Sequence, residues 1–265
     1  SYSEYIELAM EKHLDKEGRP FPFKERDTMI KIEDLKKSFG ELQALKGMDL
    51  HIPEGQTTGI VGPNGSGKTT LIKSILGLVK PDSGTIEVNN IKLNGNWEYR
   101  QDIGYMPQVA RYPENMKVYE LFDFIEGLRN REPVFKDELI GQFNLKPELE
   151  KSLRVLSGGN RQKVGATLAM MFDPKILFFD EPTAGLDPGA SFKFKEWVKN
   201  ETKKGKTILI TSHIMSELEQ LVDYVVFILE GKIRYYGTMK NLLEENREER
   251  LEGAIARMME KDQVH

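Results

Sequence analysis

The chain has 265 residues, enough for one domain of moderate size with a smaller subdomain. Its 39% of apolar and 30% of charged residues are typical of a globular protein, and its net charge of −4 argues against wrapping of nucleic acid. Without cysteine, disulfides and thiolate metal sites are excluded. No run approaches 18 consecutive apolar residues and the N-terminus lacks the pattern of a secretory signal, so we expect a cytoplasmic protein.

Residues 1–28 differ in pattern from the rest and are predicted to form an N-terminal extension. Residues 3–14 have the spacing of a short amphipathic helix, and GRPFPFKERDT (18–28) then interrupts any regular pattern. We expect the main domain to begin at Met29, and we assign no function to the extension.

Strand and helix signals alternate after Met29. Alternating apolar residues predict strands at 29–39 and 48–52, and a continuous apolar run predicts another at 57–61. A helix is expected at 71–79, after a glycine-rich loop, and a β-hairpin at 85–93.

The second half is predicted to begin with a helical insertion. Residues 109–160 show helical, charged patterns without a strong strand, and we expect them to form a helical subdomain. Apolar runs at 175–181 and 207–213 indicate parallel strands that are buried on both faces. A hairpin is expected at 224–237, and a charged C-terminal helix over 241–265.

The loop GPNGSGKT (62–69) matches the phosphate-binding pattern G-x-x-x-x-G-K-[ST], between a predicted strand and a predicted helix. Small residues let backbone N–H groups turn toward phosphate oxygens, and the helix start adds its positive end. Lys68 supplies a charge to the β- and γ-phosphates, and the Thr69 hydroxyl can bind Mg²⁺. A glycine turn with a chance lysine would not explain this context. The predicted phosphate-contacting residues are Gly62, Pro63, Asn64, Gly65, Ser66, Gly67, Lys68, Thr69 and Thr70.

The stretch ILFFDEP (176–182) supplies the acids that such a site needs. Asp180 ends an apolar strand, so its carboxylate is expected beside the phosphate-binding loop, where it can hold Mg²⁺ directly or through water. Glu181 is well placed to orient and polarise an attacking water. The simpler interpretation, two acids that merely end a strand, is less consistent with the loop upstream.

The stretch LSGGN (156–160) indicates a second anion-binding element. Ser157 is a good N-cap for the helix that follows, and a helix start with two glycines favours an anion. One nucleotide does not obviously need both elements. If each chain brings both, two chains arranged head to tail could hold two nucleotides between them.

The motifs GPNGSGKTT, YMPQ, LSGGN, ILFFDEP, AGLDP and TSH, in this order, resemble the nucleotide-binding subunit of ABC transporters. The resemblance covers residues 29–240. It implies an α/β fold, namely a P-loop NTPase (RecA-like) core with an antiparallel β subdomain and an inserted helical subdomain. It also implies ATP and Mg²⁺ as ligands, a homodimer that sandwiches ATP, and a separate integral membrane permease that holds the subunit at the inner face of the cell membrane.

The resemblance also implies roles for residues outside the phosphate loop. Phe39 would stack on adenine. Gln108 would join the core to the helical subdomain and sense the metal and the γ-phosphate. His213 would contact the γ-phosphate. Without the resemblance, Phe39 would be interpreted as a core strand residue, Gln108 as a solvated loop residue and His213 as a histidine at a strand end.

The dimer contacts follow from the same resemblance. Ser157, Gly158 and Gly159 would contact the γ-phosphate across the dimer, and Asp187 would couple the two sites. The signature of the family usually reads LSGGQ, and Asn160 replaces the glutamine here. Phosphate contact should survive this change, whereas the fine geometry is less certain. Because Glu181 is present, we expect a hydrolytically competent site.

Other classes of ATPase fit the spacing less well. Only 89 residues (157 − 68) separate Lys68 from Ser157, too few for the coiled coils of related DNA-repair and chromosome ATPases. Translation factors of this superfamily carry two cassettes, and this chain has one. A GTPase would require an N-K-x-D motif, which is absent. A non-transport ABC-type ATPase remains an alternative.

The cargo is the least determined property. GYMPQVARYPENM (104–116) and ERLEGAIARMMEK (249–261) resemble the ATPase of copper-processing ABC systems that help to mature nitrous-oxide reductase. The alternative is an ATPase of a drug, lipid or other exporter. The chain itself offers no copper site, because it lacks cysteine and its four histidines are scattered. Cargo, transport direction and membrane partner stay open at this point.

Overall fold

The computed structural model describes residues 28–95 and 97–263. These residues fall into two compact units, one formed by 28–99 and 213–263, the other by 100–212. Except for Thr28, the predicted N-terminal extension and its helix lie outside the described residues.

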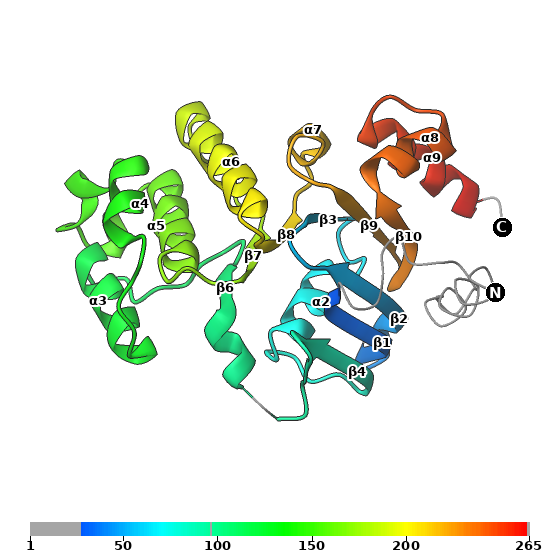
Figure 1. Cartoon of the computed structure of the whole chain (residues 1–265), viewed down its shortest axis with the longest axis horizontal. Coiled ribbons are helices and arrows are strands. Elements are labelled where there is room, and N and C mark those ends of the chain that lie inside the picture. Colours follow the sequence, from blue (N-terminus) through cyan, green and yellow to red (C-terminus); the bar gives the residue numbers. More distant parts are fainter. Residues whose placement is uncertain (1–27, 96, 264–265) are drawn as a thin grey trace, which may run out of the picture. The chain divides into compact units, whose positions relative to one another are not determined.

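An antiparallel sheet of the first unit has the strand order β2-β1-β4-β5 (Figure 1). Its strands are β1 (Thr28–Phe39), β2 (Leu42–Pro53), β4 (Ser83–Val88) and β5 (Ile91–Lys92). The predicted strand at 29–39 and the hairpin at 85–93 are confirmed. The strand predicted at 48–52 is longer, because residues from Leu42 onward continue the pairing with β1. Ile30 and Ile32 of β1 are fully buried.

The same unit contains the strand that leads into the phosphate-binding loop. This strand, β3 (Thr57–Val61), is buried throughout and pairs in parallel with β9 (Tyr224–Leu229). β9 forms the predicted hairpin with β10 (Lys232–Thr238), and both residues of its turn, Glu230 and Gly231, have positive φ, as a tight hairpin requires. After the loop, α2 (Lys68–Ile75) buries Leu71, Ile72 and Ile75.

Three helices complete the first unit: α7 (Met215–Leu218), α8 (Met239–Asn246) and α9 (Leu251–Gln263). The single C-terminal helix predicted over 241–265 is wrong, because the structure has two helices there. Arg247 ends α8 in a left-handed conformation (φ 53°), and the chain resumes as a helix only at Leu251. Residues 264–265 lie outside the described residues.

Three parallel strands form the centre of the second unit, in the order β8-β7-β6. β7 (Ile176–Asp180) and β8 (Thr207–Thr211) match the two predicted apolar runs, and every residue of both is buried. β6 (Ile103–Met106) was not indicated by the sequence pattern, because it is only four residues long. Asp180 and Glu181 lie at the carboxyl end of β7, and Gln108 follows the carboxyl end of β6.

Helices make up the rest of the second unit. They are α3 (Val118–Arg129), α4 (Lys136–Gln142), α5 (Gly158–Met170) and α6 (Pro188–Lys203). Short 3₁₀ turns occur at Lys146–Glu148 and Leu153–Val155, and a third, Glu98–Asp102, includes the point where the chain passes from the first unit to the second. α6 packs on the sheet through Phe194, whose ring meets that of Phe179 edge-on at 4.9 Å. In the part of the chain that the structure describes, no helix is both long and apolar enough to cross a bilayer.

Candidate nucleotide-binding site

The phosphate-binding loop has a backbone that only glycine tolerates at two points. Gly62 has φ +152°, and a Cβ there would lie 2.2 Å from the carbonyl oxygen of Ile228. Gly67 is the N-cap of α2 with φ +112°, and a Cβ there would lie 2.8 Å from the carbonyl oxygen of Ala44. The loop is therefore packed tightly against β2 and β9 on its inner side, while Pro63, Asn64 and Gly65 are exposed.

Polar side chains of this loop fit a phosphate ligand. The Lys68 ammonium donates to the carbonyl oxygens of Gly62 (2.7 Å) and Pro63 (3.0 Å), so it lies over the loop itself. Ser66 is only 2% exposed, and its hydroxyl has no hydrogen-bond partner among the described residues. Thr69 is exposed in the first turn of α2. A cation, a buried hydroxyl without a partner and a helix start thus occur within four residues, as a phosphate site requires.

Phe39, the predicted adenine platform, is not part of the core. It is the last residue of β1 and is 50% exposed. The Lys37 ammonium lies 5.4 Å from the centre of its ring. Asp82 holds this strand end, since its carboxylate accepts from the Lys37 ammonium (2.8 Å) and from the N–H of Ser38 (2.6 Å). These bonds lower the pKa of Asp82.

In the second unit, the carboxyl ends of adjacent parallel strands gather the predicted catalytic groups. Asp180 ends β7 and is 6% exposed, and Glu181 follows it at 7% exposed. Thr211, at the end of β8, donates its hydroxyl to Asp180 Oδ1. The N–H of Glu181 donates to the Thr211 carbonyl (3.1 Å) and hydroxyl (3.2 Å). Gln108 is exposed two residues after β6.

The backbone at Glu181 adopts a conformation that non-glycine residues rarely have. Its φ is +54°, which costs free energy and persists only where neighbouring groups hold it. Besides Thr211, the side-chain amide of Gln162 holds it, because Nε2 donates to the Glu181 carbonyl oxygen at 2.9 Å. Burial, and then the negative charge of Asp180, raise the pKa of Tyr105 to about 12, so the Tyr105 hydroxyl stays neutral beside Asp180.

The start of α5 has the cap that LSGGN predicted. The Ser157 hydroxyl accepts from the N–H of Asn160 at 3.2 Å, and both Ser157 and Gly158 are exposed. Asn160 therefore replaces the usual glutamine without loss of the cap.

Asp187 caps the next long helix. Its Oδ1 accepts from the N–H of Ala190 (2.8 Å), at the start of α6, and its Oδ2 lies 2.8 Å from the Lys163 ammonium. The bond to Lys163, followed by the bond to Ala190, lowers the pKa of Asp187. Asp187 thus stays ionised and fixes the loop that precedes α6.

The predicted residues fall into two sets, one in each unit. The first unit holds Phe39, Gly62, Pro63, Asn64, Gly65, Ser66, Gly67, Lys68, Thr69, Thr70 and the exposed His213. The second unit holds Gln108, Ser157, Gly158, Gly159, Asp180, Glu181 and Asp187. Sequence reasoning missed Thr211, Gln162 and Tyr105. Thr211 had a signal in the sequence, since it lies in the predicted strand 207–213, two residues before His213.

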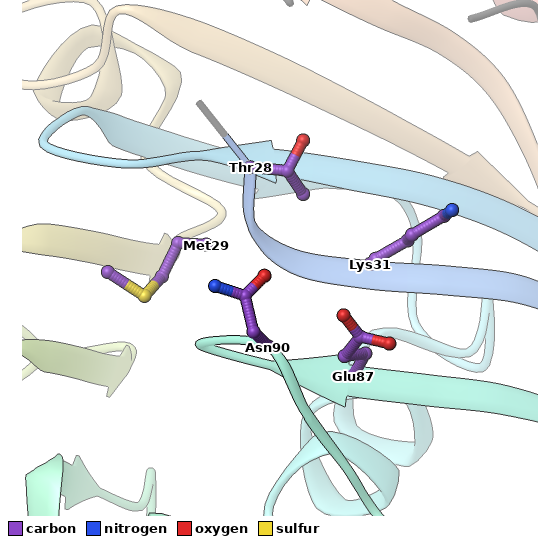
Figure 2. Close-up of a pocket in the computed structure, with 5 residues that line it drawn as sticks. All are labelled: Thr28, Met29, Lys31, Glu87 and Asn90. Atoms are coloured by element: carbon purple, nitrogen blue, oxygen red, sulfur yellow. The ribbon is translucent and has the colours of Figure 1, made fainter. Parts of the chain in front are cut away.

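A small pocket in the described part of the chain lies elsewhere in the first unit. It is lined by Thr28, Met29 and Lys31 of β1 and by Glu87 and Asn90 of the neighbouring β4–β5 hairpin (Figure 2). None of the predicted site residues lines it, so it belongs to neither set.

Comparison with known proteins decides the family. The family model described as ABC transporter matches residues 45–184. The daunorubicin resistance ATP-binding protein DrrA3 of Streptomyces coeruleorubidus is 33% identical over 231 residues, which are 85% of this chain and 73% of that protein. The chain belongs to the ABC transporter family. The lantibiotic transport ATP-binding protein SrtF of Streptococcus pyogenes is also 33% identical, over 82% of this chain and 95% of its own length.

Solved ABC cassettes have the same fold. The ATP-binding subunit of an ABC transporter superposes with a TM-score of 0.81 at 26% identity, over 88% of this chain and all of the other. A bacterial ABC transporter cassette, MJ0796, described as dimeric, superposes with a TM-score of 0.73 at 25% identity, over 80% of this chain and 99% of the other. The predictions of a P-loop NTPase fold and of an ATPase of the ABC transporter family are therefore confirmed.

Proposed function

We propose that this ABC ATPase is the motor subunit of a transporter and that the two sets of residues act on the same ATP molecule. The observation that carries the proposal is the buried pair Asp180–Glu181 at the carboxyl end of β7, with its strained backbone held from two sides. Burial of two acids and a positive φ at Glu181 both cost free energy, which favours a functional role for the pair. Together with the phosphate-binding loop, this pair supplies what ATP hydrolysis requires.

Each residue has a defined role in the proposed reaction. Lys68 leaves its own loop carbonyls to bind the β- and γ-phosphates, and the backbone N–H groups of 63–69 surround them. Phe39, exposed beside the Lys37 ammonium, stacks on adenine. Glu181 orients the attacking water and accepts hydrogen bonds from it. His213 and Gln108, both exposed, contact the γ-phosphate.

The donor set also fits Mg²⁺. The Thr69 hydroxyl, the Asp180 carboxylate and the Gln108 amide are oxygen ligands, the kind that Mg²⁺ prefers. When bound there, the ion would offset the charge of the β- and γ-phosphates. Thr211 fixes one oxygen of Asp180, which keeps the carboxylate in a single orientation.

We further propose that two copies form an ATP-dependent dimer. The exposed start of α5, with Ser157 as its cap, offers N–H groups to a γ-phosphate on the other copy. The dimeric cassette MJ0796 gives a precedent for such an assembly in a similar chain. ATP would close the dimer, and hydrolysis would open it.

A separate membrane permease would receive this movement at the inner face of the cell membrane. Two of the relatives are named for daunorubicin resistance and for lantibiotic transport, which favours an exporter of drug-like or peptide cargo. Copper processing rests on the sequence resemblance of 104–116 and 249–261 alone, and is the second candidate. In either case the cargo would be handled by the permease.

Affinity capture tests the proposal. Glu181→Gln, which should bind ATP but hardly hydrolyse it, is used with ATP and Mg²⁺ as bait on detergent-solubilised native membranes. We expect mass spectrometry to identify a polytopic membrane protein that Lys68→Ala does not retain. Recovery of copper-handling proteins together with the membrane protein would favour copper processing. Recovery of ribosomal or DNA-repair proteins alone would contradict the transporter role.

A further inference from the structure

Gln162 lies outside every motif that the sequence analysis assigned to the nucleotide. It is in the second turn of α5, half-buried, and its Nε2 donates to the carbonyl oxygen of Glu181 at 2.9 Å. We propose that Gln162 is a positioning residue: it ties the strained backbone of the catalytic Glu181 to α5, the helix whose start binds the nucleotide of the other copy. This inference rests on the proposed function.

The backbone of Glu181 needs such a tie. With φ +54° this residue adopts a conformation that a free chain would leave. On its N–H side the backbone is bonded to Thr211 of β8. Its carbonyl oxygen accepts from Gln162 Nε2 at 2.9 Å and from the N–H of Ala184 at 3.2 Å. Gln162 thus links this carbonyl to a different element of the unit, α5.

Two neighbouring contacts join the same two segments. Gly159, in the first turn of α5, lies against Gly185, and a Cβ at Gly159 would be 2.6 Å from the Gly185 carbonyl oxygen. The Lys163 ammonium, 13% exposed, lies 2.8 Å from the carboxylate of Asp187. The first two turns of α5 therefore contact the loop 181–187 at its beginning, middle and end.

A functional consequence follows from this attachment. When the start of α5 binds the γ-phosphate held by the other copy, a shift of the helix moves the carbonyl of Glu181 with it. The carboxylate of one site would then be aligned only when the other site is filled. Loss of the Gln162 bond should therefore lower turnover and cooperativity without weakening ATP binding, because the side chain of Gln162 donates to the Glu181 carbonyl and not to the phosphate-binding loop.

The test uses Gln162→Met, which keeps the side-chain length but cannot donate a hydrogen bond. Gln142→Met is the matched control, because Gln142 is also half-buried and its Nε2 also donates to a backbone carbonyl, that of Lys193, at 3.2 Å. For purified wild type and both variants, kcat, KM and the Hill coefficient for ATP are measured, together with the Kd for ATP in the Glu181→Gln background.

We expect Gln162→Met to lower kcat roughly tenfold, which converts to about 1.4 kcal/mol in the barrier. Its Hill coefficient should fall toward 1, and its Kd should stay within about twofold of wild type, as a lost positioning bond predicts. Gln142→Met should match wild type in all four values. Equal kcat and Hill coefficients for the two variants would overturn the role of Gln162. A wild type without ATPase activity would overturn the proposed function instead.

Discussion

Thr211 offers the sharpest test of how the acidic pair is held. This residue is fully buried, and its hydroxyl both donates to Asp180 Oδ1 and accepts from the N–H of Glu181. Thr211→Val keeps the shape of the side chain and removes both bonds. Thr211→Ser is the matched control, because it keeps the hydroxyl and loses a methyl group.

The magnitude follows from the two bonds. A hydrogen bond to a charged group contributes about 1.5–3 kcal/mol, and in Thr211→Val the buried Asp180 Oδ1 would lose this donor. Loss of the bond from the Glu181 N–H to the Thr211 hydroxyl costs less free energy, because this N–H also donates to the Thr211 carbonyl, which the variant keeps. We therefore expect Thr211→Val to lower the free energy of unfolding by about 2 kcal/mol relative to wild type.

Chemical denaturation of wild type and both variants measures this difference, and steady-state ATPase assays follow its effect on the site. Thr211→Val should also require more Mg²⁺ for half-maximal activity, because one oxygen of Asp180 is no longer fixed. Thr211→Ser should retain most of the activity. If the two variants were equally stable within roughly 0.5 kcal/mol and equally active, the hydroxyl would not hold the acidic pair.

Two further substitutions test the phosphate-binding loop and a buried tyrosine. Lys68→Ala should abolish ATP binding or turnover. Lys73→Ala is the control, because Lys73 is an exposed lysine in the last turn of the same helix, and it should leave both unchanged. ATPase assays and nucleotide titrations measure the two effects, and an active Lys68→Ala would contradict the assignment of the phosphate-binding loop. Burial raises the pKa of Tyr112 to about 12, so the unfolded chain ionises this tyrosine first, near pH 10. The contribution of the neutral Tyr112 hydroxyl to the free energy of unfolding is complete below pH 10 and is lost as the pH rises toward 12. Over that range wild type should lose stability faster than Tyr112→Phe, by up to about 1.4 kcal/mol per pH unit, and parallel denaturation curves would refute the burial of this hydroxyl.

Local sequence patterns predicted the elements whose geometry depends on few residues. The phosphate-binding loop was predictable because a glycine pattern, a lysine and a flanking strand and helix all lie within 20 residues. β7 and β8 were predictable because a strand buried on both faces is apolar throughout. β6 was not, since four residues provide too little periodicity to separate it from a loop.

The contacts that hold the acidic pair depend on tertiary structure. The bond from Thr211 to Asp180 joins residues that are 31 positions apart, and the one from Gln162 to Glu181 joins residues 19 apart. No local pattern encodes such pairs. The break between α8 and α9 was missed for a different reason: Arg247 adopts a left-handed backbone that the continuous charged pattern of 239–261 does not reveal.

In the proposed mechanism, ATP joins two copies of this chain. Its most direct test is the mass of Glu181→Gln in solution, measured by light scattering coupled to size-exclusion chromatography, with and without ATP and Mg²⁺. We expect a 30.4 kDa monomer without nucleotide and a species of twice that mass with ATP and Mg²⁺. A Glu181→Gln variant that binds ATP and stays monomeric at every protein concentration tested would contradict it.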